Sequence, residues 1–126
     1  MKFAKVVFWI ASGWGVLVLT PLYFIFDVIG RQDPPPITHP AFYYGFVGVA
    51  LAWQFAFFVI GSDPARFRPL MILSALEKFI YGATLVVLFL QGHLHGTDLM
   101  LAGIDTLLGI LFLVAFFKTH AVPGTA

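Results

Sequence analysis

The chain has no cysteine and few charged side chains. Without thiols it can form no disulfide, and thiolate catalysis and thiolate metal sites are excluded. Charged residues make up 10% of its 126 residues, and the formal net charge is +1. So small a net charge creates no strong electrostatic attraction to nucleic acid, so we expect no nucleic-acid partner. The sequence also lacks a phosphate-binding glycine loop and a nucleophile-elbow motif, two common signatures of enzymes.

Hydrophobic residues, by contrast, make up 60% of the chain and include 15 Phe, 4 Tyr and 3 Trp. A soluble domain carries roughly 45–50% apolar residues and about 25% charged ones. A domain this small buries too little of itself to hide so much apolar surface from water. The composition therefore predicts a protein whose solvent is a lipid bilayer.

Four long apolar runs fit that solvent, because each has close to the roughly 20 residues with which an α-helix crosses the hydrocarbon. We predict an all-α integral membrane protein with transmembrane helices over residues 6–29, 41–61, 70–90 and 99–117. The connections are short and force neighbouring helices antiparallel, which predicts an up-down-up-down four-transmembrane-helix bundle. We expect residues 1–120 to form one domain and residues 121–126 to be a disordered tail.

Proline predicts two departures from regular helix. Pro21 lies inside the first apolar run and predicts a kink there. Residues 30–40 contain four prolines and predict an extended loop.

Basic residues predict the orientation of the helices. Five of them map to one side of the membrane, and only Arg31 lies in a loop on the other side; the five are Lys2, Lys5, Arg66, Arg68 and Lys118. Basic side chains concentrate on the cytoplasmic side. We therefore predict a multi-pass protein of a bacterial-type inner membrane, with both termini in the cytoplasm.

Ionisable side chains inside the apolar runs are the first candidates for function, because each costs about 2.5–3.5 kcal/mol at a helix centre. The third run contains Glu77 and Lys78, and the fourth contains Asp105. At about 1.5 Å per residue these groups lie roughly 10–18 Å from the cytoplasmic end, and Gln54 of the second run lies at a similar depth. Tyr81, one turn beyond Glu77, lies on the same helix face.

Two interpretations of this polar layer remain open. Glu77, Lys78, Asp105, Tyr81 and Gln54 form either a ligand- or proton-binding site or a structural clasp in which Lys78 neutralises a carboxylate. Lys78 lies about 100° round its helix from Glu77, so it can turn toward Asp105 or Gln54, or extend to the headgroups. A cavity beside the carboxylates would favour the site, and a direct ion pair without a cavity would favour the clasp.

A second, weaker candidate lies at the opposite end of the helices. His93, His95, His39 and Asp98 map there together with Asp27, and two histidines with a carboxylate suit zinc, copper or nickel. The alternative is a pair of solvated histidines in a polar turn.

Aromatic residues have two interpretations as well. Trp9, Trp14 and Trp53 lie inside the apolar runs and not at their ends, where tryptophan is enriched. Either they pack against other helices, or they line a pocket for a flat apolar ligand.

Three classes of function are compatible with these features. We favour a non-enzymatic accessory protein that binds lipid or a partner helix. The alternatives are a small proton-coupled transporter that acts as an oligomer, or a membrane enzyme on a quinone- or sterol-like substrate with Glu77 and Asp105 as acid and base. We assign no catalytic residue and no cofactor. The expected partners are the bilayer itself and a second copy or another membrane protein.

Overall fold

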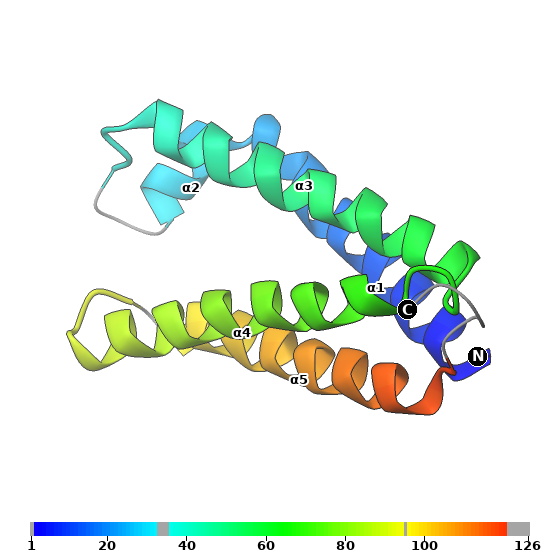
Figure 1. The fold of residues 1–126 in the computed structure, drawn as a ribbon. Helices are drawn as coiled ribbons and strands as arrows, with labels where there is room; N and C mark the ends of the chain where they lie inside the picture. Colours follow the sequence, from blue (N-terminus) through cyan, green and yellow to red (C-terminus); the bar gives the residue numbers. More distant parts are fainter. Residues whose placement is uncertain (1, 33–35, 95, 121–126) are drawn as a thin grey trace.

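The computed structural model describes residues 2–32, 36–94 and 96–120, which contain five α-helices and no strand (Figure 1). Four helices are long and apolar enough to cross a membrane. The helices are α1 (Lys2–Leu19), α2 (Phe26–Gln32), α3 (Pro40–Ser62), α4 (Arg68–Leu90) and α5 (Gly96–Lys118). The long helices alternate in direction along the chain (Figure 1). The predicted all-α fold with four transmembrane helices is confirmed.

The first helix is shorter than the predicted helix over 6–29. It ends at Leu19, and a 3₁₀ turn, η1 (Thr20–Tyr23), and the short α2 follow it. Pro21 has no backbone N–H and cannot continue the α-helical hydrogen bonds. Its carbonyl instead accepts a hydrogen bond from the N–H of Phe24 at 2.9 Å, which closes the tighter turn. Proline therefore ends this helix where the sequence predicts only a kink.

The four long helices form two closely packed pairs, α1 with α3 and α4 with α5. Small residues allow the close approach within the second pair. A Cβ on Gly82 of α4 would lie 2.6 Å from Thr106 Oγ1, and one on Gly109 of α5 would lie 2.7 Å from the Phe79 ring. In the first pair, a Cβ on Gly61 would lie 2.5 Å from the Trp9 ring. Each pair is thus held at a distance that larger residues would not permit.

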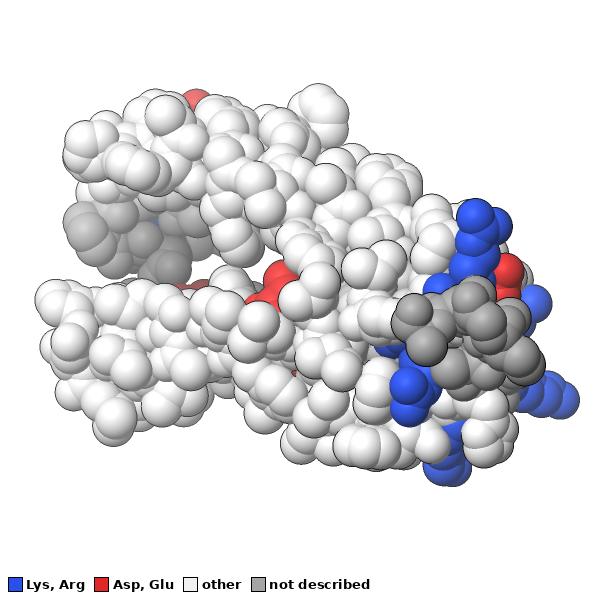
Figure 2. Space-filling view, in the orientation of Figure 1, with Lys and Arg blue, Asp and Glu red and all other residues white. Residues whose placement is uncertain are grey.

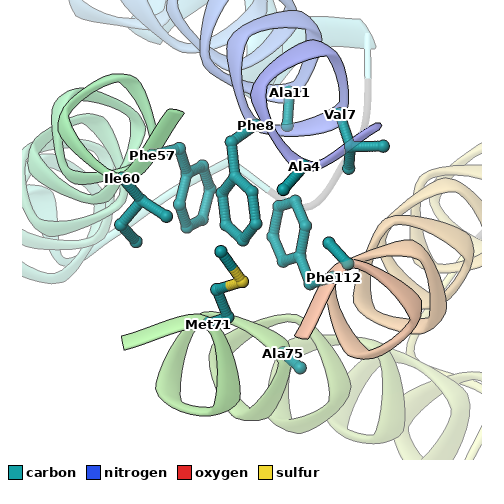
Figure 3. Close-up of a cluster of buried hydrophobic side chains, with 10 residues drawn as sticks. Ala4, Val7, Phe8, Ala11, Phe57, Ile60, Met71, Ala75 and Phe112 are labelled. Carbon is teal, nitrogen blue, oxygen red and sulfur yellow. The ribbon is translucent and has the colours of Figure 1, made fainter. Parts of the chain in front are cut away.

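An aromatic core joins the two pairs near one end of the molecule (Figure 3). Phe8 of α1 stacks on Phe112 of α5 with ring centroids 4.2 Å apart, and Phe57 of α3 contacts both rings. Met71 of α4 completes the contact among the four helices. Toward the other end the pairs diverge, and the space-filling view shows a hollow between them (Figures 1 and 2).

The end of the molecule nearest the aromatic core carries most of the basic side chains (Figure 2). One of them, Arg68 at the start of α4, donates hydrogen bonds from Nε to the carbonyls of Phe116 and Thr119, at 3.1 and 2.7 Å. Its guanidinium also lies 3.7 Å from the centroid of the Phe116 ring. The last carbonyls of a helix lack intrahelical partners and carry partial negative charge. Arg68 therefore caps the end of α5 and fixes it to α4.

The close α4–α5 contact leads to a test of stability. Gly109→Leu places a side chain where the Phe79 ring lies, so we expect the free energy of unfolding in mixed micelles to fall by about 2 kcal/mol. Gly103→Leu on the same helix is the matched control, because a Cβ there meets nothing within 4 Å. Equal stability of the two variants would contradict this packing.

Candidate functional site

Lys78 is the centre of the polar layer. It lies near the middle of α4 and is only 5% exposed, although a lysine is seldom buried. Its Nζ donates a hydrogen bond to Asp105 Oδ1 of α5 at 3.4 Å, and it lies 3.9 Å from Glu77 Oε2. The sequence leaves three directions open to the Lys78 side chain, and in the structure it points toward Asp105. The ammonium therefore links the two helices and forms an ion pair with each of two carboxylates.

Gln54 contributes a second buried polar group from α3. Its side chain is 2% exposed, and Nε2 donates a hydrogen bond to the carbonyl of Ala50 at 2.8 Å. The side chain lies in the space left by Gly15 of α1, because a Cβ on Gly15 would collide with Oε1. That oxygen accepts no hydrogen bond from the described residues. A buried amide oxygen without a donor is uncommon and requires an explanation.

A small cavity, here called the inner chamber, brings these groups together. Its volume is about 70 Å³, enough for a polar group of a few atoms. All four long helices line it, and it contains every member of the layer that the sequence singles out: Gln54, Glu77, Lys78, Tyr81 and Asp105, together with Trp14, Gly15, Val18, Leu19, Phe46, Ala50, Leu101 and Ile104. Three of the long helices supply the amide, carboxyl, ammonium and phenol groups of the lining, and α1 supplies a mainly apolar wall in which Trp14 has the one polar side-chain group.

A larger cavity, here called the lateral groove, lies between α3 and α4. Its volume is about 680 Å³, and its walls are mainly apolar. The lining residues are Gly45, Phe46, Val49, Ala50 and Trp53 of α3 and Leu73, Leu76, Glu77, Ile80, Tyr81 and Thr84 of α4. Several of them are exposed on the surface that faces hydrocarbon in a membrane, Val49 at 65% and Ile80 at 58%. The groove is therefore open to the side, between two membrane-spanning helices.

The groove and the chamber share part of their walls. Phe46, Ala50, Glu77 and Tyr81 line both. The rings of Phe46 and Tyr81 stack across the α3–α4 boundary with centroids 5.7 Å apart. Glu77 has a side chain that is 22% exposed, and its Oε2 accepts no hydrogen bond from the described residues. This carboxylate therefore belongs to the wall that the groove and the chamber share.

The three tryptophans fall into two groups. Trp14 lines the inner chamber and Trp53 lines the lateral groove. Trp9 lies away from both, where its Nε1 donates a hydrogen bond to the carbonyl of Phe58 at 3.1 Å and its ring stacks on the Phe58 ring. Trp14 and Trp53 therefore fit the pocket interpretation, and Trp9 fits the packing interpretation.

The structure has the features expected for both interpretations of the polar layer. Lys78 is paired with Asp105, as a clasp requires, and a cavity adjoins the carboxylates, as a site requires. The lateral groove was not foreseen from the sequence, because Phe46, Val49 and Ile80 have the character of ordinary lipid-facing residues. Gly15 makes room for Gln54. In the sequence it indicates only a small residue at a helix contact, so it does not predict this space.

The candidate metal ligands are not assembled among the described residues, which contain no group of three or more His, Asp or Glu able to hold an ion. His39 precedes α3 and contacts the Phe42 ring, His93 is exposed in the turn after α4, and Asp98 is in the first turn of α5. Asp27 is in α2. His95 lies outside the described residues.

No protein-family model, curated protein or solved structure matches the chain. Function is therefore inferred from the geometry of the groove, the chamber and the ion pair.

The ion pair can be tested by removing one partner at a time. Lys78→Met leaves the Asp105 carboxylate without its cation, and we expect the free energy of unfolding to fall by about 2–3 kcal/mol. Lys78→Met with Asp105→Asn should recover most of that loss. Lys78→Met with Glu77→Gln should recover less, because Glu77 is farther from Nζ and shares no hydrogen bond with it. Equal recovery in both double variants would contradict the assigned pairing.

Proposed function

We propose that this membrane protein is a non-enzymatic binding protein that takes an amphiphilic molecule from the bilayer into the lateral groove, with its polar head at the inner chamber. The observation that carries this proposal is that an apolar groove and a small polar cavity lie side by side and share Glu77 and Tyr81 in their walls. Ligand sites are commonly apolar clefts of about 300–1,000 Å³ with a few polar groups that fix orientation. The groove has this size and this distribution of groups.

The dimensions of the groove suit a single chain or a flat apolar body. From Leu73 to Thr84 the α4 wall is about 16 Å long, at 1.5 Å rise per residue. An occupant would replace lipid tails against Val49 and Ile80 and gain packing with two aromatic residues, Trp53 and Phe46. Lipid itself is as apolar as the walls, so packing and the polar head have to supply the selectivity.

The basic end of the helices orients the site. We place Lys2, Lys5, Arg66 and Lys118 at the cytoplasmic surface of a bacterial-type inner membrane, with both termini there. The aromatic core then lies toward the cytoplasmic leaflet, and the helix pairs diverge toward the exterior.

Transport and catalysis would use the same residues and demand more of the fold. Proton-coupled transport requires access to the carboxylates from both sides, so the core around Phe8, Phe57 and Phe112 would have to open, or a second copy would have to complete the path. Acid–base catalysis by Glu77 and Asp105 requires both carboxyls to be free to exchange a proton with substrate, while Asp105 is engaged by Lys78. Binding requires neither change, since the groove is already open.

Filling the groove tests the binding role. The probes are tritiated dodecylamine, dodecan-1-ol and dodecanoate, each added alone to protein in phosphatidylcholine nanodiscs, with binding measured by scintillation proximity. We expect saturable binding of at least one probe. Val49→Trp puts a larger side chain into the groove and should weaken that binding about tenfold, equivalent to an overpacking cost of roughly 1–3 kcal/mol.

Val59→Trp is the matched control, because Val59 is exposed on the same helix and lines neither cavity. It should bind like the unmodified protein. If no probe binds saturably, or if both variants lose binding equally, the groove is not the binding site.

A further inference from the structure

The unsatisfied oxygens of the inner chamber define the hydrogen bonding of a ligand head. Gln54 Oε1 and Glu77 Oε2 are buried and accept no hydrogen bond from the described residues. Gln54 donates a hydrogen bond from Nε2 to Ala50, so its polar atom without any partner among the described residues is the acceptor Oε1. Burial of an acceptor without a donor is unfavourable. A head group that complements both atoms therefore has to donate hydrogen bonds.

The charges around the chamber favour a cation. Glu77 and Asp105 supply two carboxyl groups, and Lys78 supplies one ammonium. The remaining titratable group of the lining is the Tyr81 phenol, and the lining residues of α1 and α3 carry no charge. Hydrocarbon strongly disfavours an unbalanced ion. The second carboxyl therefore needs a bound proton or a cationic group beside it.

Aromatic rings line both the chamber and the groove. Trp14 and the stacked pair Phe46 and Tyr81 line the chamber, and Trp53 lies along the groove. Aromatic faces attract ammonium groups, and the attraction is stronger where water is excluded. The lysine of the layer already uses this interaction, with Nζ 5.3 Å from the Phe57 ring centroid.

We propose that the ligand of the lateral groove is a primary amine on an apolar chain, whose ammonium enters the inner chamber and donates hydrogen bonds to Glu77 Oε2 and Gln54 Oε1. This inference rests on the proposed binding function and adds the chemistry of the head group. A carboxylate or phosphate head would meet Glu77 and Asp105 as like charges. An alcohol head would donate one hydrogen bond and leave the second carboxyl unbalanced.

The three dodecyl probes test this inference because they share a chain and differ in the head. Partitioning into the lipid is subtracted with protein-free nanodiscs of the same lipid as the blank, and Val49→Trp protein shows how much of the remaining binding depends on the groove. We expect dodecylamine to bind about tenfold more tightly than dodecan-1-ol, which is the gain that one charge-assisted hydrogen bond provides. We expect dodecanoate to bind most weakly.

Glu77→Gln tests the assigned partner of the ammonium. It removes one negative charge and keeps the size of the side chain, and it leaves Lys78 and Asp105 as a balanced pair. The ratio of the alcohol to the amine dissociation constant should fall about tenfold. Ser74→Ala is the matched control on α4, because Ser74 bonds to its own helix and lines neither cavity. Thermal unfolding of each variant checks that it remains folded.

The outcomes separate the two proposals. If dodecan-1-ol or dodecanoate binds as tightly as dodecylamine and that binding is lost in Val49→Trp, the amine inference is wrong and the binding function stands. An unchanged ratio in folded Glu77→Gln protein also overturns the inference. If no probe shows binding that depends on Val49, the binding function fails, and the head-group inference fails with it.

Discussion

The ion pair between Lys78 and Asp105 is the interaction on which the arrangement of polar groups depends. Hydrocarbon cannot solvate either charge, so each has to find its partner within the protein. The bond joins α4 to α5 at mid-length and fixes the ammonium beside Glu77. One cation then faces two carboxyl groups in a chamber that four helices enclose. The ion pair that joins the two helices therefore leaves the chamber with one more carboxyl group than ammonium groups.

The hollow beside this clasp follows from an uneven distribution of packing. Glycines bring α4 close to α5 and α3 close to α1, and the rings of Phe8, Phe57 and Phe112 join the two pairs at one end only. Beyond that core, α3 and α4 make few contacts with each other. The lateral groove is the space that results, and Phe46 stacked on Tyr81 separates it from the chamber. The packed aromatic core lies toward the basic end, and the groove lies beyond it.

The sequence determines the number and type of the long helices, because an apolar run of about 20 residues has few alternatives in lipid. It also indicates the depth of Gln54, Glu77 and Asp105, which the structure places around one cavity. It does not specify which helices pair, so the groove was not predicted from it. Pro21 ends α1 at Leu19, but a proline within an apolar run is compatible with either a kink or a helix end, so the sequence alone did not distinguish them. The direction of Lys78 was open for the same reason, since a long flexible side chain takes the partner that tertiary packing provides.

Photolabelling in the membrane is the measurement that tests the central claim most directly. A dodecylamine with a diazirine in its chain, activated in phosphatidylcholine nanodiscs and mapped by peptide mass spectrometry, marks the residues that the bound chain touches. The groove as described predicts saturable adducts on α3 and α4 at Val49, Leu76 and Ile80, which excess unlabelled amine removes. Labelling spread over lipid-facing residues outside the groove, such as Val59 and Leu107, and unaffected by competitor would contradict the account.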